Sequence, residues 1–451
     1  MDWNTIYSTQ RTGQSLSTSI DARTEFQRDF DRIIFSTSFR RLQNKTQVFP
    51  LPKNILVHNR LTHSLEVASV GRTLGALIGQ HIAEKFTKHL TDDAKAFYQH
   101  SLYNVIAAAC LCHDIGNPAF GHSGEDAIAH FFIENERHLK SYFNDEQWFD
   151  FIHFEGNANA MRLLTHQQNG KDEGGLKLTH TTLASIAKYP CEAKGKQKGI
   201  LHRKKFGFLQ SQKEIFKDIA LSTNMIMEND NPLIYKRHPF VWLVEIADDI
   251  CYNIIDVEDA HRLGIISFDT CKTLFTDIIH ALNPESNYNK KLNTISDKNE
   301  TIAFLRALCI NYLIKAAVKC YEENIDAILD GSLNKSIINI IKEKCIALDT
   351  IEKFSIENIY GYKAVVEIEN AGYNVMYELL QHFIPPILKI KSDRSNADKK
   401  ALQLVAPQFI YDNNNTYENV LGIIDFVSGM TDNYATDLYR KIKGIEIGMS
   451  F

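Results

Sequence analysis

Apolar residues recur along this chain with the spacing of a helix face, and this pattern predicts most of its elements. Between residues 60 and 85, two apolar faces share one helix, the first carrying Leu61, Leu65, Ala68, Gly75, Ile78 and Ile82, and the second carrying His63, Val67, Val70, Leu74 and Leu77. A further stripe follows Phe240, Leu243, Ala247, Ile250, Ile254 and Val257. No strand-turn pattern repeats, so we predict an all-α fold.

A third helical stretch is apolar on nearly every side and ends on two polar residues. Its interior, residues 105–111, is followed at once by Cys112, His113 and Asp114. An imidazole and a carboxylate at the end of a buried helix need a partner that offsets their desolvation. A divalent cation is one such partner, and a satisfied core contact is the other interpretation.

Two of the other helices each add a candidate metal ligand. His63 lies inside the first helix, and Asp248, Tyr252 and Asp256 recur every four residues beside the apolar stripe of the second. Taken singly, a buried His is more often a hydrogen-bonded core residue, and an Asp-Asp pair is usually solvated. Together, two imidazoles and two carboxylates suit Mn²⁺, Mg²⁺, Fe²⁺ or Zn²⁺.

This pattern resembles the HD superfamily of metal-dependent phosphohydrolases. The resemblance implies that the metal ligands are His63, His113, Asp114 and Asp248. Asp249 is the rival for the last position, and Asp248 is preferred because it keeps the four-residue spacing with Tyr252 and Asp256.

Five further motifs occur in order and narrow the resemblance. They are Arg40 to Pro50, His113 to Glu125, Phe154 to Ala158, Ala187 to Pro190, and Ser428 to Asp432. Together they resemble the deoxyguanosine triphosphate triphosphohydrolases, bacterial relatives of the mammalian SAM-and-HD-domain dNTPase. The match spans about residues 20 to 265 and returns near 425 to 443, with no recognised motif from about 270 to 400.

The resemblance implies an HD-domain helical core with an additional helical C-terminal region. We expect residues 1–265 to form the catalytic core with an N-terminal helical segment, and residues 266–405 to form a helical accessory region. Residues 406–451 would be a helical segment that completes the core or makes an oligomer contact.

The implied reaction is hydrolysis of a deoxynucleoside triphosphate at the α-phosphate, yielding deoxynucleoside and tripolyphosphate. His122 and Glu125 match the catalytic pair of the family. A neutral imidazole can take a proton near pH 7, and a carboxylate three residues on can orient it. Ser123, followed by Asp126, is typical of a helix N-cap, which would place the pair at a helix start.

Seven residues match family positions that contact substrate: Gln47, Val48, Arg60, Lys188, Tyr189, Tyr252 and Asp256. Lys188 and Tyr189 offer an ammonium and a phenol to the polyphosphate tail. Gln47 would bond the 3′ hydroxyl, and Val48 would form a tight wall that rejects a 2′ hydroxyl.

The other three are placed on the phosphate and sugar side. Tyr252 and Asp256 line it, with Asp256 accepting from a sugar hydroxyl. Arg60, one turn before His63, would pair a phosphate, and a surface ion pair is its alternative role.

Composition limits the class of protein without naming it. The 451 residues carry a formal net charge of −5, which gives no general argument for nucleic-acid binding. No apolar run approaches about 18 residues and the chain starts with polar residues, so we expect no membrane span and no secretion. The eight cysteines lie mostly in apolar helical contexts, which favours free thiols in a reducing cytoplasm.

The resemblance also suggests partners and leaves alternatives open. Family members form dimers or hexamers, and some respond to a dNTP effector at a second site or to single-stranded DNA. The basic segment 194–205 is a candidate DNA contact, with a solvated surface loop as the alternative.

The alternative functions are an HD phosphodiesterase or 5′-nucleotidase, and a nucleotide-sensing regulator with weak or no catalysis. The sequence favours Mn²⁺ or Mg²⁺ without choosing between them, and leaves the preferred base open.

Overall fold

The computed structural model describes residues 1–14, 23–49, 57–170, 172–411 and 413–446, and helices dominate them. Up to the middle of the chain the helices are α1 (Glu25–Ile34), α2 (Thr37–Arg40), α3 (Arg60–Lys85), α4 (Asp92–His100), α5 (Leu102–Cys112), α6 (Gly121–Glu134), α7 (Glu136–Leu139), α8 (Asp145–Ile152), α9 (Gly156–Thr165), α10 (His180–Ile186) and α11 (Lys213–Ser222). The remaining helices are α12 (Val241–Arg262), α13 (Phe268–Leu282), α14 (Asn289–Leu292), α15 (Lys298–Glu323), α16 (Ile325–Leu329), α17 (Ile337–Lys344), α18 (Ile346–Ser355), α19 (Lys363–Leu388), α20 (Asn396–Gln403), α21 (Thr416–Ser428) and α22 (Asp432–Ile442).

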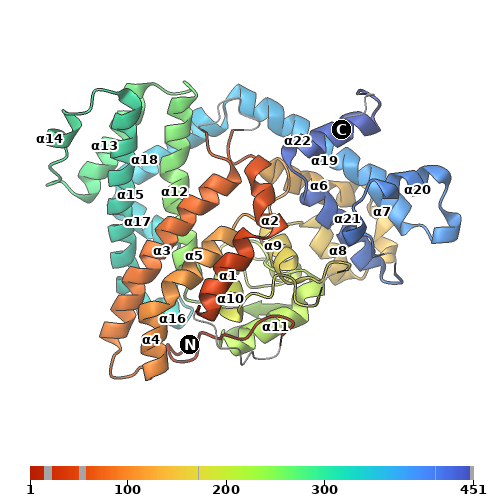
Figure 1. The fold of residues 1–451 in the computed structure, drawn as a ribbon, viewed down its shortest axis with the longest axis horizontal. Helices are drawn as coiled ribbons and strands as arrows, with labels where there is room; N and C mark the ends of the chain where they lie inside the picture. The colour runs from red at the N-terminus through yellow and green to blue at the C-terminus, as the bar shows by residue number, and fades with distance from the viewer. Residues whose placement is uncertain (15–22, 50–56, 171, 412, 447–451) are drawn as a thin grey trace.

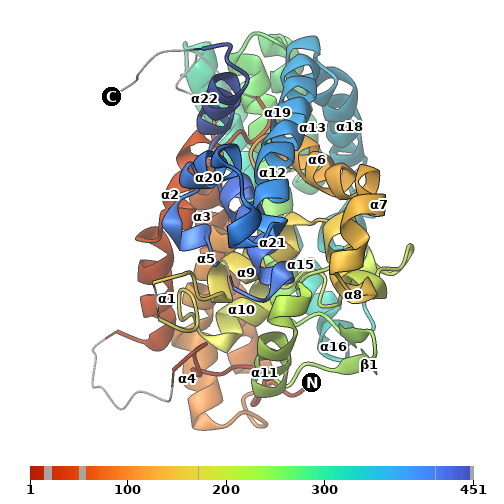
Figure 2. The same ribbon diagram turned by 90° about the vertical axis from the view of Figure 1, so that its right-hand side faces the viewer.

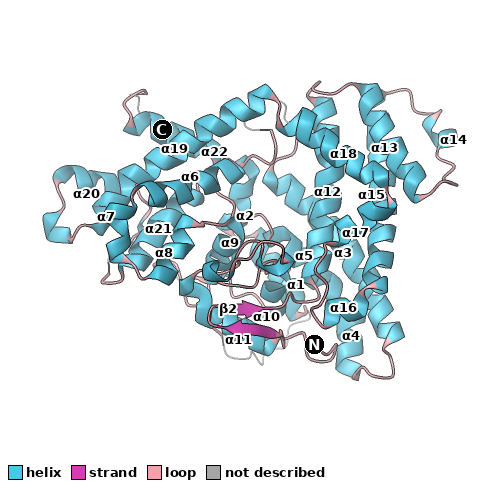
Figure 3. Ribbon diagram, turned by 180° about the vertical axis from the view of Figure 1, so that it is seen from behind, coloured by secondary structure: helices cyan, strands magenta, loops and turns pink. Residues whose placement is uncertain are grey.

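Short elements complete the described chain. Strands β1 (Met227–Asp230) and β2 (Leu233–Tyr235) form one antiparallel hairpin, drawn as magenta arrows in Figure 3. One π-helical turn, Ile356–Tyr360, joins α18 to α19. The 3₁₀ turns are Arg41–Asn44, Lys140–Tyr142, Ala193–Gly195, Leu201–Arg203, Gln210–Gln212, Lys391–Asp393 and Pro407–Phe409. The all-α prediction is confirmed, with this hairpin as its small exception.

The helices pack around two hydrophobic cores. One core gathers α3, α5, α12, α13 and α15, and the other gathers α6, α8, α19, α21 and α22. In Figure 1 these groups lie on opposite sides of the molecule, and Figure 2 shows the second group face-on. Long α19 packs against α6, α21 and α22, so it ties the C-terminal part of the chain to the segment that follows His113.

Helices α3, α5 and α12 form the scaffold on which the predicted ligands lie. The interior of α5 is buried on every side, as its composition predicts. Helix α3 begins at an Asn59 cap that accepts the amides of Leu61 and Thr62. Most of its two predicted apolar faces is buried, but Leu65 and Leu77 are 42% and 45% exposed, so the expectation was wrong for these two side chains.

Helix α6 begins earlier than its capping signal predicts. Ser123 lies within the first turn rather than at the cap, because Phe120 adopts the left-handed conformation and the helix starts at Gly121. His122 therefore lies in the first turn, and Glu125 follows at the start of the second. The geometry of Phe120, not a Ser side chain, sets where this helix begins.

One helix among the described residues, α15, is long and apolar enough by length and composition to cross a membrane. The sequence expectation of no such stretch therefore needs correction, since 18 of its residues reach a mean hydropathy of 1.5. Core helices of soluble proteins meet the same criterion, and α15 packs against α3, α12, α13 and α17. All eight cysteines are buried and free.

Candidate active site

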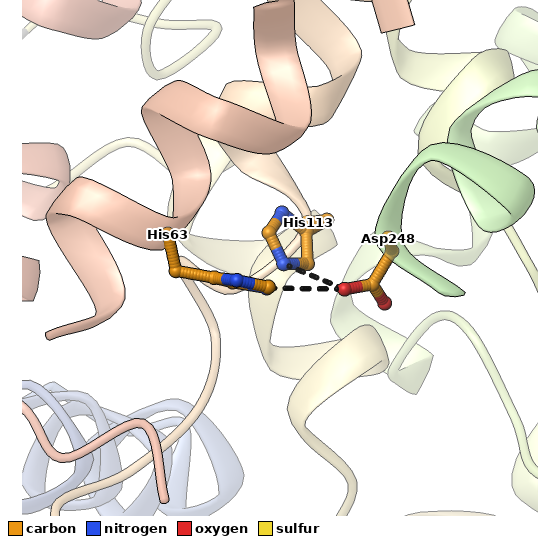
Figure 4. Close-up of side chains that lie close together, drawn as sticks. All are labelled: His63, His113 and Asp248. Carbon is orange, nitrogen blue, oxygen red and sulfur yellow. Dashed lines mark hydrogen bonds and ion pairs between the residues drawn. The ribbon is translucent and has the colours of Figure 1, made fainter. Parts of the chain in front are cut away.

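Three predicted ligands meet where α3, α5 and α12 converge. His63 lies in the first turns of α3, His113 caps the C-terminal end of α5, and Asp248 lies in the second turn of α12. Asp248 Oδ1 is 3.2 Å from Nε2 of His63 and 3.5 Å from Nε2 of His113 (Figure 4). The three ligand atoms lie within 4.8 Å of one another, which is the spacing that a single cation needs.

The hydrogen bonds of this cluster suit a metal ion. Nδ1 of His113 lies 2.7 Å from the carbonyl oxygen of Cys110, so that nitrogen carries the proton and Nε2 keeps its lone pair. Nε2 of His113 is buried and has no hydrogen-bond partner. Burial would raise the pKa of Asp248, but His113, Lys188 and His63 hold it well below its usual range. An ionised carboxylate and two imidazoles therefore face one point, and the residues fit a divalent ion.

Asp114, the fourth predicted ligand, is held at the edge of this cluster. Its Oδ2 is 2.8 Å from Nη1 of Arg60 and 3.5 Å from Nε2 of His113. Its Oδ1 accepts a hydrogen bond from Asn117. Arg60 is 7% exposed, so its pair with Asp114 is a buried one and not the surface ion pair considered from sequence. The role of Asp114 as a ligand stays a prediction.

The neighbouring Asp249 does not reach the imidazoles. The converging cluster contains Asp248 alone from this pair. Burial, with the charges of Glu245 and Asp248, raises the pKa of Asp249 to about 8. The Lys188 ammonium lies 3.3 Å from Oδ2 of Asp248, on the side away from the histidines. This geometry favours Asp248 over its rival.

The predicted catalytic pair forms one hydrogen-bonded unit. Nδ1 of His122 is 2.7 Å from Oε2 of Glu125, and the Gly156 amide donates to Oε1 of Glu125 at 2.7 Å. Gly156 begins α9, and a Cβ there would lie 2.3 Å from Oδ1 of Asn117 and 2.7 Å from Oε1 of Glu125. Only glycine permits this approach, which explains why the Phe154–Ala158 motif carries it.

The pKa shifts of His122 and Glu125 favour an ion pair between the two side chains. The hydrogen bond to Glu125 raises the pKa of His122 above its ordinary value. Burial works against ionisation of Glu125, but His122 and Lys205 lower its pKa overall. The His122 side chain is exposed at the cavity, whereas Glu125 is buried. The imidazole is thus free to meet a substrate while its orienting carboxylate stays fixed.

A cavity of about 500 Å³ joins the metal cluster to this pair. Its lining includes these residues predicted from sequence: Gln47, Val48, Arg60, His113, Asp114, His122, Glu125, Lys188, Tyr189, Asp248 and Tyr252. His63 lies behind the lining and is fully buried. Oε1 of Gln47 is buried without a hydrogen-bond donor, so it is available to a ligand hydroxyl.

Asp256 lies behind the cavity wall. It is 2% exposed, and its Oδ2 accepts a hydrogen bond of 2.9 Å from the Tyr360 hydroxyl. The Tyr360 ring stacks on Tyr252 with centroids 5.6 Å apart. Burial raises the pKa of Asp256 to about 7. Because Asp256 is buried and does not line the cavity, the direct sugar contact expected for it stays a prediction.

Several lining residues were not expected from sequence, and they are Thr46, Asn117, Phe120, Gly121, Glu155, Asn157, Lys205, Tyr360, Val365 and Glu369. Tyr360, Val365 and Glu369 come from the region without recognised motifs. Lys205 ends the basic segment for which the sequence suggested a DNA contact or a solvated surface loop, but it lines the cavity and its ammonium pairs with Glu155 at 2.8 Å. Two short 3₁₀ turns also interrupt that segment.

Comparisons with known proteins agree with this geometry. The HD domain family matches residues 60–148. A deoxyguanosinetriphosphate triphosphohydrolase-like protein of Synechocystis sp. is 35% identical over 99% of this chain and 100% of its own length. The corresponding protein of Pseudomonas aeruginosa is 33% identical over 98% and 99%. The deoxyguanosinetriphosphate triphosphohydrolase of Yersinia enterocolitica is 30% identical over 93% and 94%. Because these similarities span both partners almost end to end, the chain belongs to the deoxyguanosinetriphosphate triphosphohydrolase family of HD-domain proteins.

Proposed function

We propose that this protein is a metal-dependent dNTP triphosphohydrolase that releases deoxynucleoside and inorganic tripolyphosphate. The observation that carries the proposal is one cavity lined by His113 and Asp248 of the three-ligand cluster, by the His122–Glu125 pair and by two lysines. Family membership over the full length supports the same activity.

His63, His113 and Asp248 would hold the divalent ion, with Asp114 as a fourth candidate ligand. A bound ion in such a site polarises a phosphoryl oxygen and lowers the pKa of a bound water. The protein residues do the remaining work, which is to bind the anionic substrate and to place the proton.

His122 would carry out the proton transfer. In the reaction a water oxygen bonds to the α-phosphorus and the water releases a proton to solvent, while the bond from that phosphorus to the 5′ oxygen breaks and the 5′ oxygen leaves as a hydroxyl. The hydrogen bond to Glu125 raises the pKa of His122 and so favours its protonated form, which is suited to give its Nε2 proton to the leaving oxygen. This refines the sequence expectation, in which the imidazole takes a proton. Glu125 orients the ring and stabilises its charge.

Four side chains of the cavity suit a triphosphate. Arg60, Lys188 and Lys205 supply cationic groups, and Tyr189 supplies a phenol. Burial lowers the pKa of Lys205, but Glu155 and Glu125 raise it overall, so it carries its charge near neutral pH. Each of these cations pairs a carboxylate in the protein alone, and a polyphosphate would compete for it.

The sugar side of the cavity suits a deoxyribose. The buried Gln47 Oε1 can accept from a 3′ hydroxyl, and Val48, the next lining residue, would form the wall that rejects a 2′ hydroxyl. Tyr252, at 38% exposure, offers its ring to the sugar or phosphate. Asp256 would join them once Tyr360 moves.

Product analysis tests this function. The purified protein is incubated with each of the four dNTPs, singly and in pairs, with Mn²⁺ or Mg²⁺, and the products are separated. Deoxynucleoside with tripolyphosphate supports the proposal. Release of pyrophosphate or monophosphate would instead favour another HD phosphohydrolase, and no turnover with retained nucleotide binding would favour a regulator.

Finer features extend the proposal. We propose Mn²⁺ or Mg²⁺ as the ion because carboxylate and imidazole ligands accept both. We also propose a cytoplasmic homo-oligomer, dimer or hexamer, in which a second dNTP acts as effector and single-stranded DNA as a further ligand. Activity that appears only in dNTP mixtures would establish the effector site, and sedimentation velocity gives the oligomeric state.

A further inference from the structure

The motif Ser428 to Asp432 has no role in the chemistry described so far, yet from the far end of the chain it contacts two segments that line the cavity. Asp432 is the first residue of α22 and is 1% exposed. Its Oδ1 accepts the Phe120 amide at 3.1 Å, and its Oδ2 accepts the Thr46 amide at 2.9 Å. The Thr46 hydroxyl donates to the same Oδ2. One buried carboxylate therefore fixes two segments that lie 74 residues apart in sequence.

Each of these segments carries a predicted substrate or catalytic group. Thr46 directly precedes Gln47 and Val48, which form the sugar side of the cavity. Phe120 lies two residues before His122, at the start of α6. The position of Asp432 thus couples the wall that contacts the sugar to the helix turn that carries the proton donor.

The backbone at Phe120 needs such a constraint. Its φ of 61° and ψ of 18° are left-handed, a conformation that a bulky residue adopts only where its surroundings enforce it. The Phe120 ring packs against Gly372 of α19, where an added Cβ would come within 2.2 Å of the ring. The ring is held by α19 and the amide by Asp432, so the direction in which α6 leaves this turn depends on both.

Lys45 joins the same three segments independently. Its buried ammonium donates to the carbonyl oxygens of Asn117, at 2.6 Å, and Ser428, at 2.8 Å. The segments around residues 45, 118 and 430 are therefore connected at two points. Side-chain hydrogen bonds to backbone groups in a buried setting give this junction a single geometry.

We infer that Asp432 is a positioning residue for catalysis, which sets the sugar-contacting wall and the His122 turn relative to each other. The inference rests on the proposed function of the cavity. Asp432 neither lines the cavity nor belongs to the metal cluster, and it acts through Phe120 and Thr46.

The substitution Asp432→Asn tests it with little change in shape. An amide offers one acceptor oxygen, so its NH₂ group must face either the Phe120 amide or the donors of Thr46. We expect kcat for the preferred dNTP to fall about 10- to 100-fold, since small misplacements of a reacting group cost rate on this scale. The preference for dNTP over NTP, in kcat/KM, should fall about 5- to 10-fold. Bound metal should stay at the wild-type level, because the ligands lie on α3, α5 and α12.

Asp150→Asn is the matched control. Asp150 is also 1% exposed, accepts a backbone amide from Gln210 at 2.7 Å and bonds the hydroxyl of Tyr417 on α21. It joins the C-terminal part of the chain to α8 but does not line the cavity. We expect its kcat and its dNTP preference to stay within about twofold of wild type.

Hydrogen exchange supplies a readout that does not depend on activity. In Asp432→Asn the peptides containing Thr46 and Phe120 should exchange faster, and peptides of α3 and α12 should not change. Lost kcat and lost sugar discrimination with wild-type metal content, absent in Asp150→Asn, support the inference. Kinetics equal to wild type, or equal losses in both variants, would overturn it. If the wild-type protein releases no tripolyphosphate from any dNTP, the proposed function fails on its own, and unchanged exchange at both amides would still overturn the role of Asp432.

Discussion

Replacing Glu125 by Gln removes the charge that orients His122 and little else. Oε2 of Glu125 lies 2.7 Å from Nδ1 of His122, and Oε1 accepts the Gly156 amide. Gln keeps the size and can keep the bond from Gly156, but its NH₂ group then faces the imidazole. The variant Glu125→Gln therefore isolates the ion pair.

The expected loss follows from the strength of that contact. A hydrogen bond to a charged partner contributes about 1.5–3 kcal/mol. At about 1.4 kcal/mol per factor of ten, loss of this stabilisation in the transition state lowers kcat about 10- to 150-fold. The direction in which the pH profile of activity shifts also follows from this contact. Glu125 raises the pKa of His122, so its removal lowers that pKa. If protonated His122 is required, activity declines as pH rises through this pKa, and the alkaline limb moves to lower pH.

The assay is steady-state tripolyphosphate release from pH 5.5 to 9.5 with saturating metal. Asp126→Asn is the control, because Asp126 is the neighbouring acid, is exposed and does not line the cavity. It should retain wild-type kcat and an unshifted profile. A Glu125→Gln enzyme with wild-type kcat and an unmoved alkaline limb would refute the assignment of the proton to this pair.

Further variants test the other parts of the site. Asp248→Ala should lose bound metal, measured by mass spectrometry of the dialysed protein, while Asp249→Ala keeps it; the reverse result would transfer the ligand role to Asp249. Gly156→Ala should unfold with about 1–3 kcal/mol less stability in urea and lose kcat, because its Cβ would meet Glu125, and an unchanged midpoint would contradict the close approach. Lys205→Met should raise KM for the triphosphate more than it lowers kcat, as expected for a cation that binds the substrate tail, and an unaltered KM would place Lys205 in a purely structural pair with Glu155.

The pattern of apolar residues predicted much of the site because the candidate ligands lie on or beside long, strongly periodic helices. The spacing of Asp248, Tyr252 and Asp256 put them on one face of α12, and two of the three line the cavity. His63 and His113 meet Asp248 because α3, α5 and α12 cross at one place, which only the resemblance to a known family could suggest.

The remaining features depend on tertiary contacts that leave no local signal. Val365 and Glu369 enter the cavity because α19 packs against α6, and Tyr360 because the π-helical turn packs against α12; nothing in their own segments predicts it. The start of α6 was misplaced because a left-handed Phe120, held by a residue more than 300 positions away, outweighs the capping propensity of Ser123. The interpretation of the 194–205 segment rested on its charge. Its last residue, Lys205, instead pairs with Glu155 and lines the cavity.

Hydrolysis in ¹⁸O-labelled water identifies the phosphorus that water attacks and the bond that breaks. The protein is incubated with its preferred dNTP and divalent metal, and both products are analysed by mass spectrometry. Attack of water on the α-phosphorus with cleavage of the bond to the 5′ oxygen places one labelled oxygen in tripolyphosphate and none in the deoxynucleoside. Label in the deoxynucleoside, or labelled nucleoside monophosphate with pyrophosphate, would contradict the proposed triphosphohydrolase reaction.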